Sequence, residues 1–287
     1  MTSPEQFATG DWIGPYRIVS LIGSGAFGRV YKVEDEYHAC KAMKVTHDNQ
    51  KMNLFNEYTM CKAWWENPPA AQMISIPRAY CYANLDEPTP DSSFFTCDLL
   101  QSTLAQGKRA FERNEKTILR LARMGFLSLK HLHERIQRVH GDIKPEHIMI
   151  DKLKSLYWID FGLSKTVPTS DFVHSDQFCG TLRYGSIALH QGHTATCRDD
   201  AESFVYTLLY LYYGSLPWED SIPSTTTVLE QSRAVMQLKQ NWLNEQLRNF
   251  SSPSVVQILV EILRALQQCQ FAELPAYDTF LVQCLTV

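Results

Sequence analysis

Two acidic residues and a lysine near the middle of the chain have the types and spacing that phosphoryl transfer needs. Asp142 and Lys144 belong to segment 139–147, and Asp160 follows the apolar run that ends at Ile159. In phosphoryl transfer, one carboxylate positions the attacking hydroxyl, a second holds a metal ion on the phosphates, and a cation neutralises the developing charge. A single Asp-Phe-Gly could simply lie in a turn, but two such acidic loops favour catalysis.

A glycine-rich segment near the N-terminus could hold phosphate oxygens against backbone N–H groups. Gly23, Gly25 and Gly28 have the spacing G-x-G-x-x-G. In a dinucleotide-binding fold these glycines would open a helix, whereas here they join segments 16–22 and 30–33, which both alternate like β-strands. The pattern predicts a flexible flap over phosphates. A plain glycine-rich hairpin is the alternative.

Lys44, on a third predicted strand, could reach the α- and β-phosphates of a nucleotide. Ala42 is small and Val30 is branched, so both could cover an adenine ring. Lys41 and Lys32 compete for the phosphate role. Their spacing from the glycines is less suitable, and we expect both to be solvated.

Glu57 is the expected partner of Lys44, because it lies on a helix predicted over residues 52–65. A glutamate on a helix surface is usually solvated, so the interpretation of Glu57 depends on Lys44. We expect Lys44 and Asp160 to line a cleft as polar surface residues, whose loss changes stability little.

The remaining periodicity predicts a small sheet followed by helices. Strands are expected at 16–22, 30–33, 40–45, 72–83 and 94–99, and helices at 52–65, 115–134, from 198 onward, 229–247, 253–268 and 277–284. The helix after Arg198 is apolar on nearly all sides, so it should be buried. Residues 1–13 predict a leader that is mobile as far as Trp12. Asp98 to Leu100 predicts a hinge, with Cys97 bordering the adenine pocket.

Composition narrows the class of protein. The 287 residues carry a formal net charge of −4, which does not indicate a nucleic-acid or membrane partner. The eight cysteines contain no C-x-x-C pair and the nine histidines form no metal-ligand pattern, so we expect a reducing compartment, cytoplasm or nucleus. We also expect a monomer.

Together the motifs resemble eukaryotic-type protein kinases over nearly the whole chain. The matching positions are Gly23-x-Gly25-x-x-Gly28-x-Val30, Ala42-Met43-Lys44, Glu57, His140-Gly141-Asp142, Lys144-Pro145 and Asp160-Phe161-Gly162. Segments 180–187, 198–200 and 213–218 more narrowly resemble the casein kinase 1 superfamily, which has a Ser-Ile-Asn-like segment where other kinases have Ala-Pro-Glu. The resemblance implies an α+β, bilobal kinase domain over residues 1–287. Its small antiparallel-sheet N-lobe would span 14–97, and its mainly helical C-lobe 98–287.

The resemblance also implies the activity, ATP-dependent transfer of the γ-phosphate to Ser or Thr hydroxyls of protein substrates. Asp142 would be the catalytic base, Lys144 would contact the γ-phosphate, and Thr181 would brace both. Asp200 would hold the catalytic loop through its backbone N–H groups, while His140 and Phe161 would pack as structural residues. The nucleotide-binding residues would be Gly23, Gly25, Gly28, Val30, Ala42, Lys44, Glu57, Asp98 and Leu100. Asp160 and His147 would hold Mg²⁺ or Mn²⁺.

Three positions depart from the family pattern. Gly141 replaces the arginine that normally pairs with a phosphorylated activation loop, so we expect that control to be absent. His147 replaces the metal-binding asparagine, and imidazole is a poor substitute for a hard oxygen ligand. A pseudokinase that works as a scaffold therefore stands as the alternative to an active kinase.

The third departure concerns a basic pocket by which casein kinase 1 enzymes favour acidic or phosphorylated substrates. Arg183 matches one member of that pocket. Ile222 stands where the family has lysine, and the acids Glu219 and Asp220 precede it. We expect a weak preference for phosphorylated substrates.

Overall fold

The computed structural model describes residues 7–25, 28–47, 50–70, 74–85, 92–168, 178–221, 227–248 and 254–285. The chain forms two compact units: unit 1 comprises residues 1–68, 76–101 and 150–162, and unit 2 comprises residues 69–75, 102–149 and 163–287. A β-sheet dominates unit 1, and helices dominate unit 2. The predicted α+β class, with a sheet-rich N-terminal part and a mainly helical C-terminal part, is confirmed.

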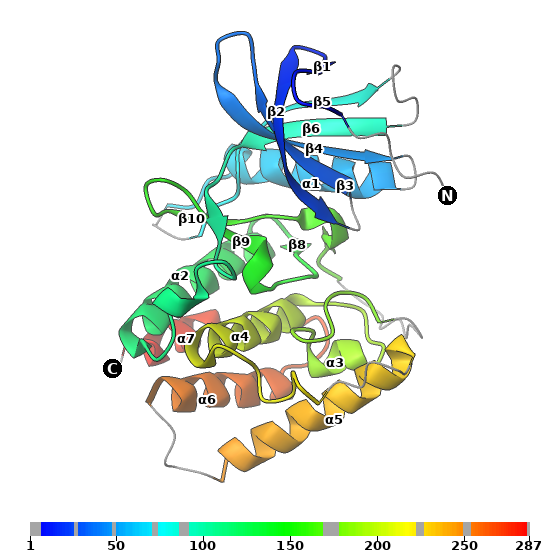
Figure 1. The fold of residues 1–287 in the computed structure, drawn as a ribbon. Helices are drawn as coiled ribbons and strands as arrows, with labels where there is room; N and C mark the ends of the chain where they lie inside the picture. The colour runs from blue at the N-terminus through cyan, green and yellow to red at the C-terminus, as the bar shows by residue number, and fades with distance from the viewer. Residues whose placement is uncertain are drawn as a thin grey trace. The chain divides into compact units, whose positions relative to one another are not determined.

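Unit 1 contains an antiparallel sheet with strand order β1-β2-β3-β4-β6-β5 (Figure 1). The strands are β1 (Trp12–Ile13), β2 (Tyr16–Gly25), β3 (Gly28–Glu34), β4 (Cys40–His47), β5 (Ala79–Leu85) and β6 (Ser92–Asp98). Tyr31, Val33 and Met43 point to one face of the sheet and form its buried core. Val30 pairs with Lys44 across β3 and β4, so these two side chains lie on the opposite face.

Helix α1 (Lys51–Glu66) packs against β4, β5 and β6. Its buried residues Leu54, Glu57, Cys61 and Trp64 are spaced by three or four positions, so they share one helix face. The helix ends before the Pro68-Pro69 pair, as the sequence predicts.

The N-terminal leader is more ordered than predicted. Phe7 packs edge-on against Tyr31 with ring centroids 5.9 Å apart. Gly10 N donates a hydrogen bond of 2.9 Å to Ile18 O. The expectation of mobility as far as Trp12 is therefore wrong for residues 7–11.

The strand predicted over 72–83 is also wrong for residues 74–78. Residues 71–73 lie outside the described ranges, and β5 begins only at Ala79. Pro77 has no N–H to donate to a neighbouring strand, which explains the late start.

Unit 2 is built around a central buried helix, α4. Its helices are α2 (Glu115–Glu134), α3 (Ile187–His190), α4 (Cys197–Tyr213), α5 (Val228–Gln246), α6 (Ser254–Gln268) and α7 (Tyr277–Gln283). Helix α4 contacts α2 and α6, and nearly all of its residues are buried. The prediction of a buried helix that is apolar on nearly all sides is confirmed. Its N-terminus is closed by a capping box between Thr196 and Asp199.

Short elements carry the candidate catalytic loops. These are β7 (Ser102–Thr103), β8 (Arg138–Val139), β9 (Ile148–Ile150), β10 (Leu156–Trp158), β11 (Lys165–Thr166) and 3₁₀ helices at Lys108–Ala110, Pro145–His147 and Phe161–Leu163. Asp142 lies between β8 and β9, and Asp160 follows β10. No helix within the described ranges is long and apolar enough to cross a membrane.

Candidate active site

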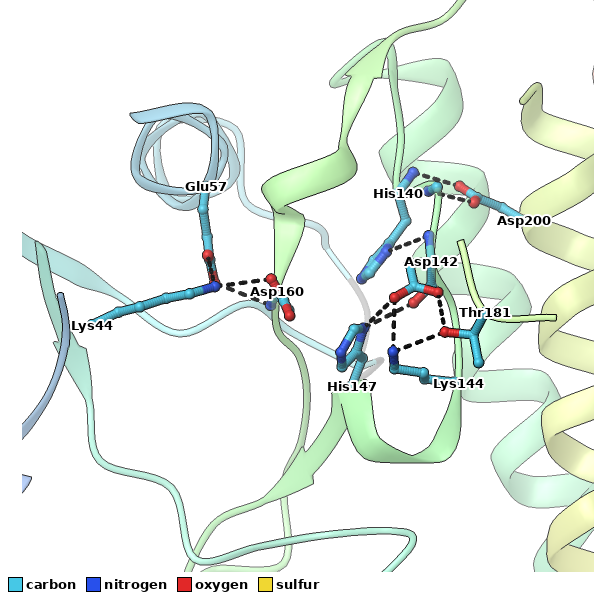
Figure 2. Close-up of polar contacts among 10 residues, drawn as sticks. Lys44, Glu57, His140, Asp142, Lys144, His147, Asp160, Thr181 and Asp200 are labelled. Carbon is cyan, nitrogen blue, oxygen red and sulfur yellow. Dashed lines mark hydrogen bonds and ion pairs between the residues drawn. The ribbon is translucent and has the colours of Figure 1, made fainter. Parts of the chain in front are cut away.

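In unit 1, Lys44 forms ion pairs with two carboxylates (Figure 2). Its Nζ lies 2.6 Å from Glu57 Oε2 and 2.9 Å from Asp160 Oδ1. Strand β4 supplies the lysine, helix α1 the glutamate, and the loop after β10 the aspartate. The predicted pairing of Lys44 with Glu57 is present. The fold also brings Asp160 to Lys44, although 116 positions separate the two residues in the sequence.

The Lys44–Glu57 ion pair is buried, and the pKa of each of its two residues is shifted. Burial by itself lowers the pKa of Lys44, but the charges of Glu57 and Asp160 outweigh burial and raise it above its ordinary value. Burial raises the pKa of Glu57, and Lys44 opposes that shift. Only 12% of the Lys44 side chain and 8% of the Glu57 side chain are exposed, so Lys44 is not the surface residue that the sequence predicts.

Asp160 adopts a backbone conformation that is uncommon for a residue with a side chain. Its φ is 63°, in the left-handed region. Its backbone N–H donates to Glu57 Oε1 at 3.1 Å, so Glu57 binds both the main chain of Asp160 and the lysine. Such conformations persist where surrounding contacts hold them, and they cluster at functional sites.

The candidate adenine-covering residues share one face of the sheet. Ala42 pairs with Cys97 across β4 and β6, and Val30 pairs with Lys44 across β3 and β4. Cross-strand partners point to the same face, so Cys97 lies on the face that carries Ala42 and Lys44.

Gly28 is the one glycine of the flap whose contacts exclude any side chain. Its φ is +124°, and a Cβ there would lie 2.2 Å from Val45 O. Gly25 pairs with Gly28 in the hairpin, so β2 and β3 extend into the predicted flap. Ala26 and Phe27, which follow Gly25 in the sequence, lie outside the described ranges.

At the predicted hinge, Asp98 is tied to strand β5. Its backbone N donates to Arg78 O at 3.2 Å, and its carboxylate accepts hydrogen bonds from Arg78 N at 2.8 Å and Tyr80 Oη at 2.6 Å. Leu100 follows β6 outside any strand.

Lys41 has a different partner from Lys44. It pairs with Asp35, and its Nζ lies over the rings of Tyr16 and Tyr80. The expectation that Lys41 is solvated is therefore wrong, since only 14% of its side chain is exposed.

In unit 2, three predicted catalytic residues form a closed hydrogen-bonded group (Figure 2). Lys144 Nζ lies 2.8 Å from Asp142 Oδ2 and 2.9 Å from Thr181 Oγ1. Thr181 Oγ1 donates to Asp142 Oδ1 at 2.7 Å. Each carboxylate oxygen of Asp142 therefore accepts one hydrogen bond, which fixes the orientation of the carboxylate.

Asp200 holds the backbone before Asp142, as the resemblance implies. Its carboxylate accepts from His140 N at 2.6 Å and from Gly141 N at 2.9 Å. It also accepts from Nε2 of the fully buried His133, whose Nδ1 lies 2.5 Å from the Tyr277 hydroxyl.

No role was predicted from the sequence for His133, whose side chain contacts Asp200 and Tyr277. The available signal was that His133 lies four positions after Leu129, so the two residues share the apolar face of α2.

Gly141 cannot take up a side chain without rearrangement. Its φ is +84°, and a Cβ there would lie 2.9 Å from Leu163 O. The backbone geometry thus matches the absence of the arginine that most kinases have at this position.

One ring nitrogen of His147, Nδ1, is hydrogen-bonded to the loop that carries Asp142. Nδ1 lies 2.9 Å from Asp142 O, and because a carbonyl only accepts, Nδ1 carries the proton. When the ring is neutral, Nε2 is then the nitrogen with the lone pair. The ring is mostly buried and stacks on His140, with centroids 6.2 Å apart and an interplanar angle of 26°.

Asp160 and His147 differ in how well their donor atoms suit a divalent metal ion. Asp160 offers carboxylate oxygens, the ligands that Mg²⁺ prefers, whereas His147 offers a nitrogen. Mg²⁺ in phosphoryl-transfer sites takes one or two protein carboxylates and completes its shell with phosphate and water oxygens.

Comparison with known proteins places the chain in a family. The protein kinase domain profile matches residues 16–270. Two Encephalitozoon cuniculi (strain GB-M1) proteins named "Probable casein kinase I homolog" are similar. One is 27% identical over 272 residues, 91% of this chain and 81% of that protein. The other is 31% identical over 216 residues, 71% of this chain and 67% of that protein.

A shorter match is to the "Casein kinase 1-like protein HD16" of Oryza sativa subsp. japonica. It is 41% identical over 104 residues, which cover 32% of this chain and 14% of that protein. The motifs, the fold and these matches agree: the chain belongs to the protein kinase family, within its casein kinase 1 superfamily.

Proposed function

We propose that this protein is an active serine/threonine kinase that transfers the γ-phosphate of ATP to protein hydroxyls. The observation that carries the proposal is the group formed by Asp142, Lys144 and Thr181. Asp142 is mostly buried and oriented by two donors, so its carboxylate is fixed where it can accept a hydroxyl proton. Lys144, held at 2.8 Å from it, would place a positive charge beside the reacting oxygen.

The ion-paired group of Lys44, Glu57 and Asp160 in unit 1 would bind the nucleotide and its metal ion. Lys44 would bind phosphate oxygens of ATP, with Glu57 fixing its ammonium group. Asp160 would hold the metal ion, which when bound neutralises charge on the phosphates. The sheet face with Val30, Ala42 and Cys97 would pack against the adenine.

A pseudokinase is the second candidate, and His147 is the observation that favours it. An imidazole stands where the family has an amide, and its Nδ1 is already bonded to the Asp142 carbonyl. Loss of one metal ligand lowers rate without removing the base, the lysines or Asp160. We therefore favour activity.

The reducing compartment predicted from the cysteines also remains a proposal. All eight cysteines are free thiols in the structure. Cytoplasm and nucleus both suit a protein of this kind.

A paired assay separates the two candidate functions. Thermal unfolding with ATP plus Mg²⁺ or Mn²⁺ measures binding, since ligand at about 100 times its Kd stabilises by about 2.7 kcal/mol. Transfer of labelled phosphate to casein measures catalysis, and phosphoamino-acid analysis distinguishes Ser and Thr from Tyr. The matched control is Asp142→Asn, which should keep the thermal shift and lose transfer.

An active kinase shows both the shift and the transfer. A shift without transfer by the wild type would move the assignment to the pseudokinase. Labelled phosphotyrosine as the main product would overturn the Ser/Thr specificity.

A further inference from the structure

Lys239 is a fully buried lysine of helix α5 that the proposed mechanism does not use. It belongs to the buried stripe formed by Ser232, Val235, Lys239 and Leu243. Lysine is almost never fully buried without partners. A lysine in the inward stripe of an amphipathic helix is thus a signal that sequence reasoning could have used.

The ammonium group of Lys239 meets three hydrogen-bond acceptors. Nζ donates to Leu182 O at 3.2 Å, to Gly185 O, and to Nε2 of His190 at 3.1 Å. An ammonium has three donors, so all of them are used. Its Nζ also lies 4.7 Å from the Tyr206 ring centroid and 5.4 Å from that of Trp218.

Helix α5 also fixes the tautomer of His190. Nδ1 of His190 lies 2.8 Å from Ser232 Oγ. Since Nε2 accepts from Lys239, the ring proton is on Nδ1, which donates to Ser232. Ser232 and Lys239 are seven residues apart, two helical turns, so one helix face engages both ring nitrogens.

The two carbonyls that Lys239 binds belong to a tight turn, residues 181–185. The turn is closed by Tyr184 N and Gly185 N, which donate to Thr181 O at 2.9 and 2.8 Å. A third carbonyl of the turn, that of Arg183, accepts from Trp218 Nε1 at 2.9 Å. The first residue of the turn is Thr181, whose side chain is hydrogen-bonded to Asp142 and Lys144.

We propose that Lys239 is a positioning residue whose ammonium group fixes the turn 181–185 and thereby holds Thr181 against the catalytic Asp142 and Lys144. The chain of contacts is continuous: Lys239 binds the carbonyls on both sides of the turn, and Thr181 begins it. The proposal rests on the kinase function proposed above, for which Thr181 orients the base.

The pKa of Lys239 sets the pH at which its ammonium form is present. Burial lowers the pKa of Lys239 to about 7, and the Glu202 carboxylate on α4 raises it. The neighbouring His190 remains neutral because burial lowers its pKa to about 2. The amine is therefore mainly protonated at about pH 6, where the experiment is best performed.

The test combines hydrogen exchange with a double-mutant cycle. Lys239→Met removes the donors and nearly preserves length, and Lys116→Met, on the exposed side of α2, is the matched control. We expect faster amide exchange at Tyr184 and Gly185 in Lys239→Met alone. We also expect a loss of about tenfold to a hundredfold in kcat with little change in KM for ATP.

The cycle adds Thr181→Val. If Lys239 acts through Thr181, Lys239→Met should lower kcat much less in the Thr181→Val background than in the wild type. A merely structural lysine would give the same factor in both backgrounds. If Lys239→Met does not fold, Lys239→Gln, which keeps amide donors on a shorter side chain, replaces it in every arm.

Each outcome decides the matter. Unchanged exchange at Tyr184 and Gly185 overturns the fixed turn, whether or not the protein transfers phosphate. Changed exchange with equal kcat losses in both backgrounds overturns the positioning role. A wild type that binds ATP without transferring phosphate refutes the proposed function and the positioning role with it, while the exchange result still decides what holds the turn.

Discussion

The guanidinium of Arg183 is paired with the carboxylate of Glu219, with Nη2 2.8 Å from Oε1. The other oxygen of Glu219 accepts from Leu216 N at 3.1 Å, which fixes the carboxylate in the same turn. The arginine that resembles part of the family's basic pocket is therefore already neutralised within the chain. Ile222, where the family has lysine, lies outside the described residues.

This pairing predicts that phosphorylated substrates gain little. For peptide pairs with and without phosphoserine three residues before the acceptor, we expect similar kcat/KM values in the wild type. Glu219→Gln removes the competing charge, so the phosphorylated peptide should gain about tenfold, equivalent to about 1.4 kcal/mol.

Asp220→Asn is the matched control, because it changes net charge equally but leaves the Arg183–Glu219 pair intact. A strong preference for the phosphorylated peptide in the wild type would refute the prediction. Equal gains in kcat/KM for the phosphorylated peptide in Glu219→Gln and Asp220→Asn would also refute it.

Lys44→Met should abolish phosphate transfer and also destabilise the protein. Removing one partner of a buried ion pair leaves Glu57 uncompensated, which costs about 3 kcal/mol or more. This replaces the expectation, drawn from sequence, that stability would change little. Asp160→Ala should also abolish phosphate transfer. It should lower the stability of the protein less than Lys44→Met does, because the Asp160 side chain is more exposed.

A second substitution tests the cause of that loss. In Lys44→Met/Glu57→Gln the buried carboxylate is neutral, so the variant should recover part of the stability but none of the activity. Urea unfolding and the casein assay measure both properties. A double variant no more stable than Lys44→Met would show that the loss does not come from the unpaired carboxylate.

His147 should make the metal preference of the enzyme unusual. Imidazole nitrogen suits Mn²⁺ better than Mg²⁺, so we expect faster transfer with Mn²⁺. His147→Asn should raise the rate supported by Mg²⁺ by about tenfold to a thousandfold. The thermal shift caused by ATP plus Mg²⁺ should also be larger in His147→Asn than in the wild type.

His147→Gln is a useful control, because it supplies an amide oxygen on a longer side chain. Equal rates and an equal metal preference in the wild type and His147→Asn would show that His147 does not contact the metal.

Acid should destabilise the fold through His190. Burial lowers the pKa of His190 from 6.5 to about 2, and the positive charge of Lys239 acts in the same direction. Between these values the unfolded chain binds a proton that the folded chain does not. The stability contribution of His190 is therefore complete above about pH 6.5 and falls by about 1.4 kcal/mol per pH unit below it.

The check is urea unfolding at about pH 7.5 and pH 5.5 for the wild type and His190→Gln. The variant is expected to start less stable but to lose less stability on acidification, by about 1 kcal/mol. Parallel losses in the two proteins would exclude His190 as the titrating group.

The sequence by itself determined most of the longer elements and the family. Helix α2 was predicted with its observed bounds, because apolar residues repeated every three or four positions define a helix face locally. The motifs around Lys44, Asp142 and Asp160 identified the kinase resemblance, because the residues of each single motif lie within a few positions of one another.

Only the tertiary structure decided how distant residues meet. Lys239 reaches Leu182, 57 positions away, and His133 reaches Tyr277, 144 positions away. Local periodicity says which face of a helix is buried but not which segment covers it, so a buried lysine or histidine has no visible partner in the sequence. The same reason explains Arg183: its neutralisation by Glu219 depends on the fold that brings two loops together, not on the type of either residue.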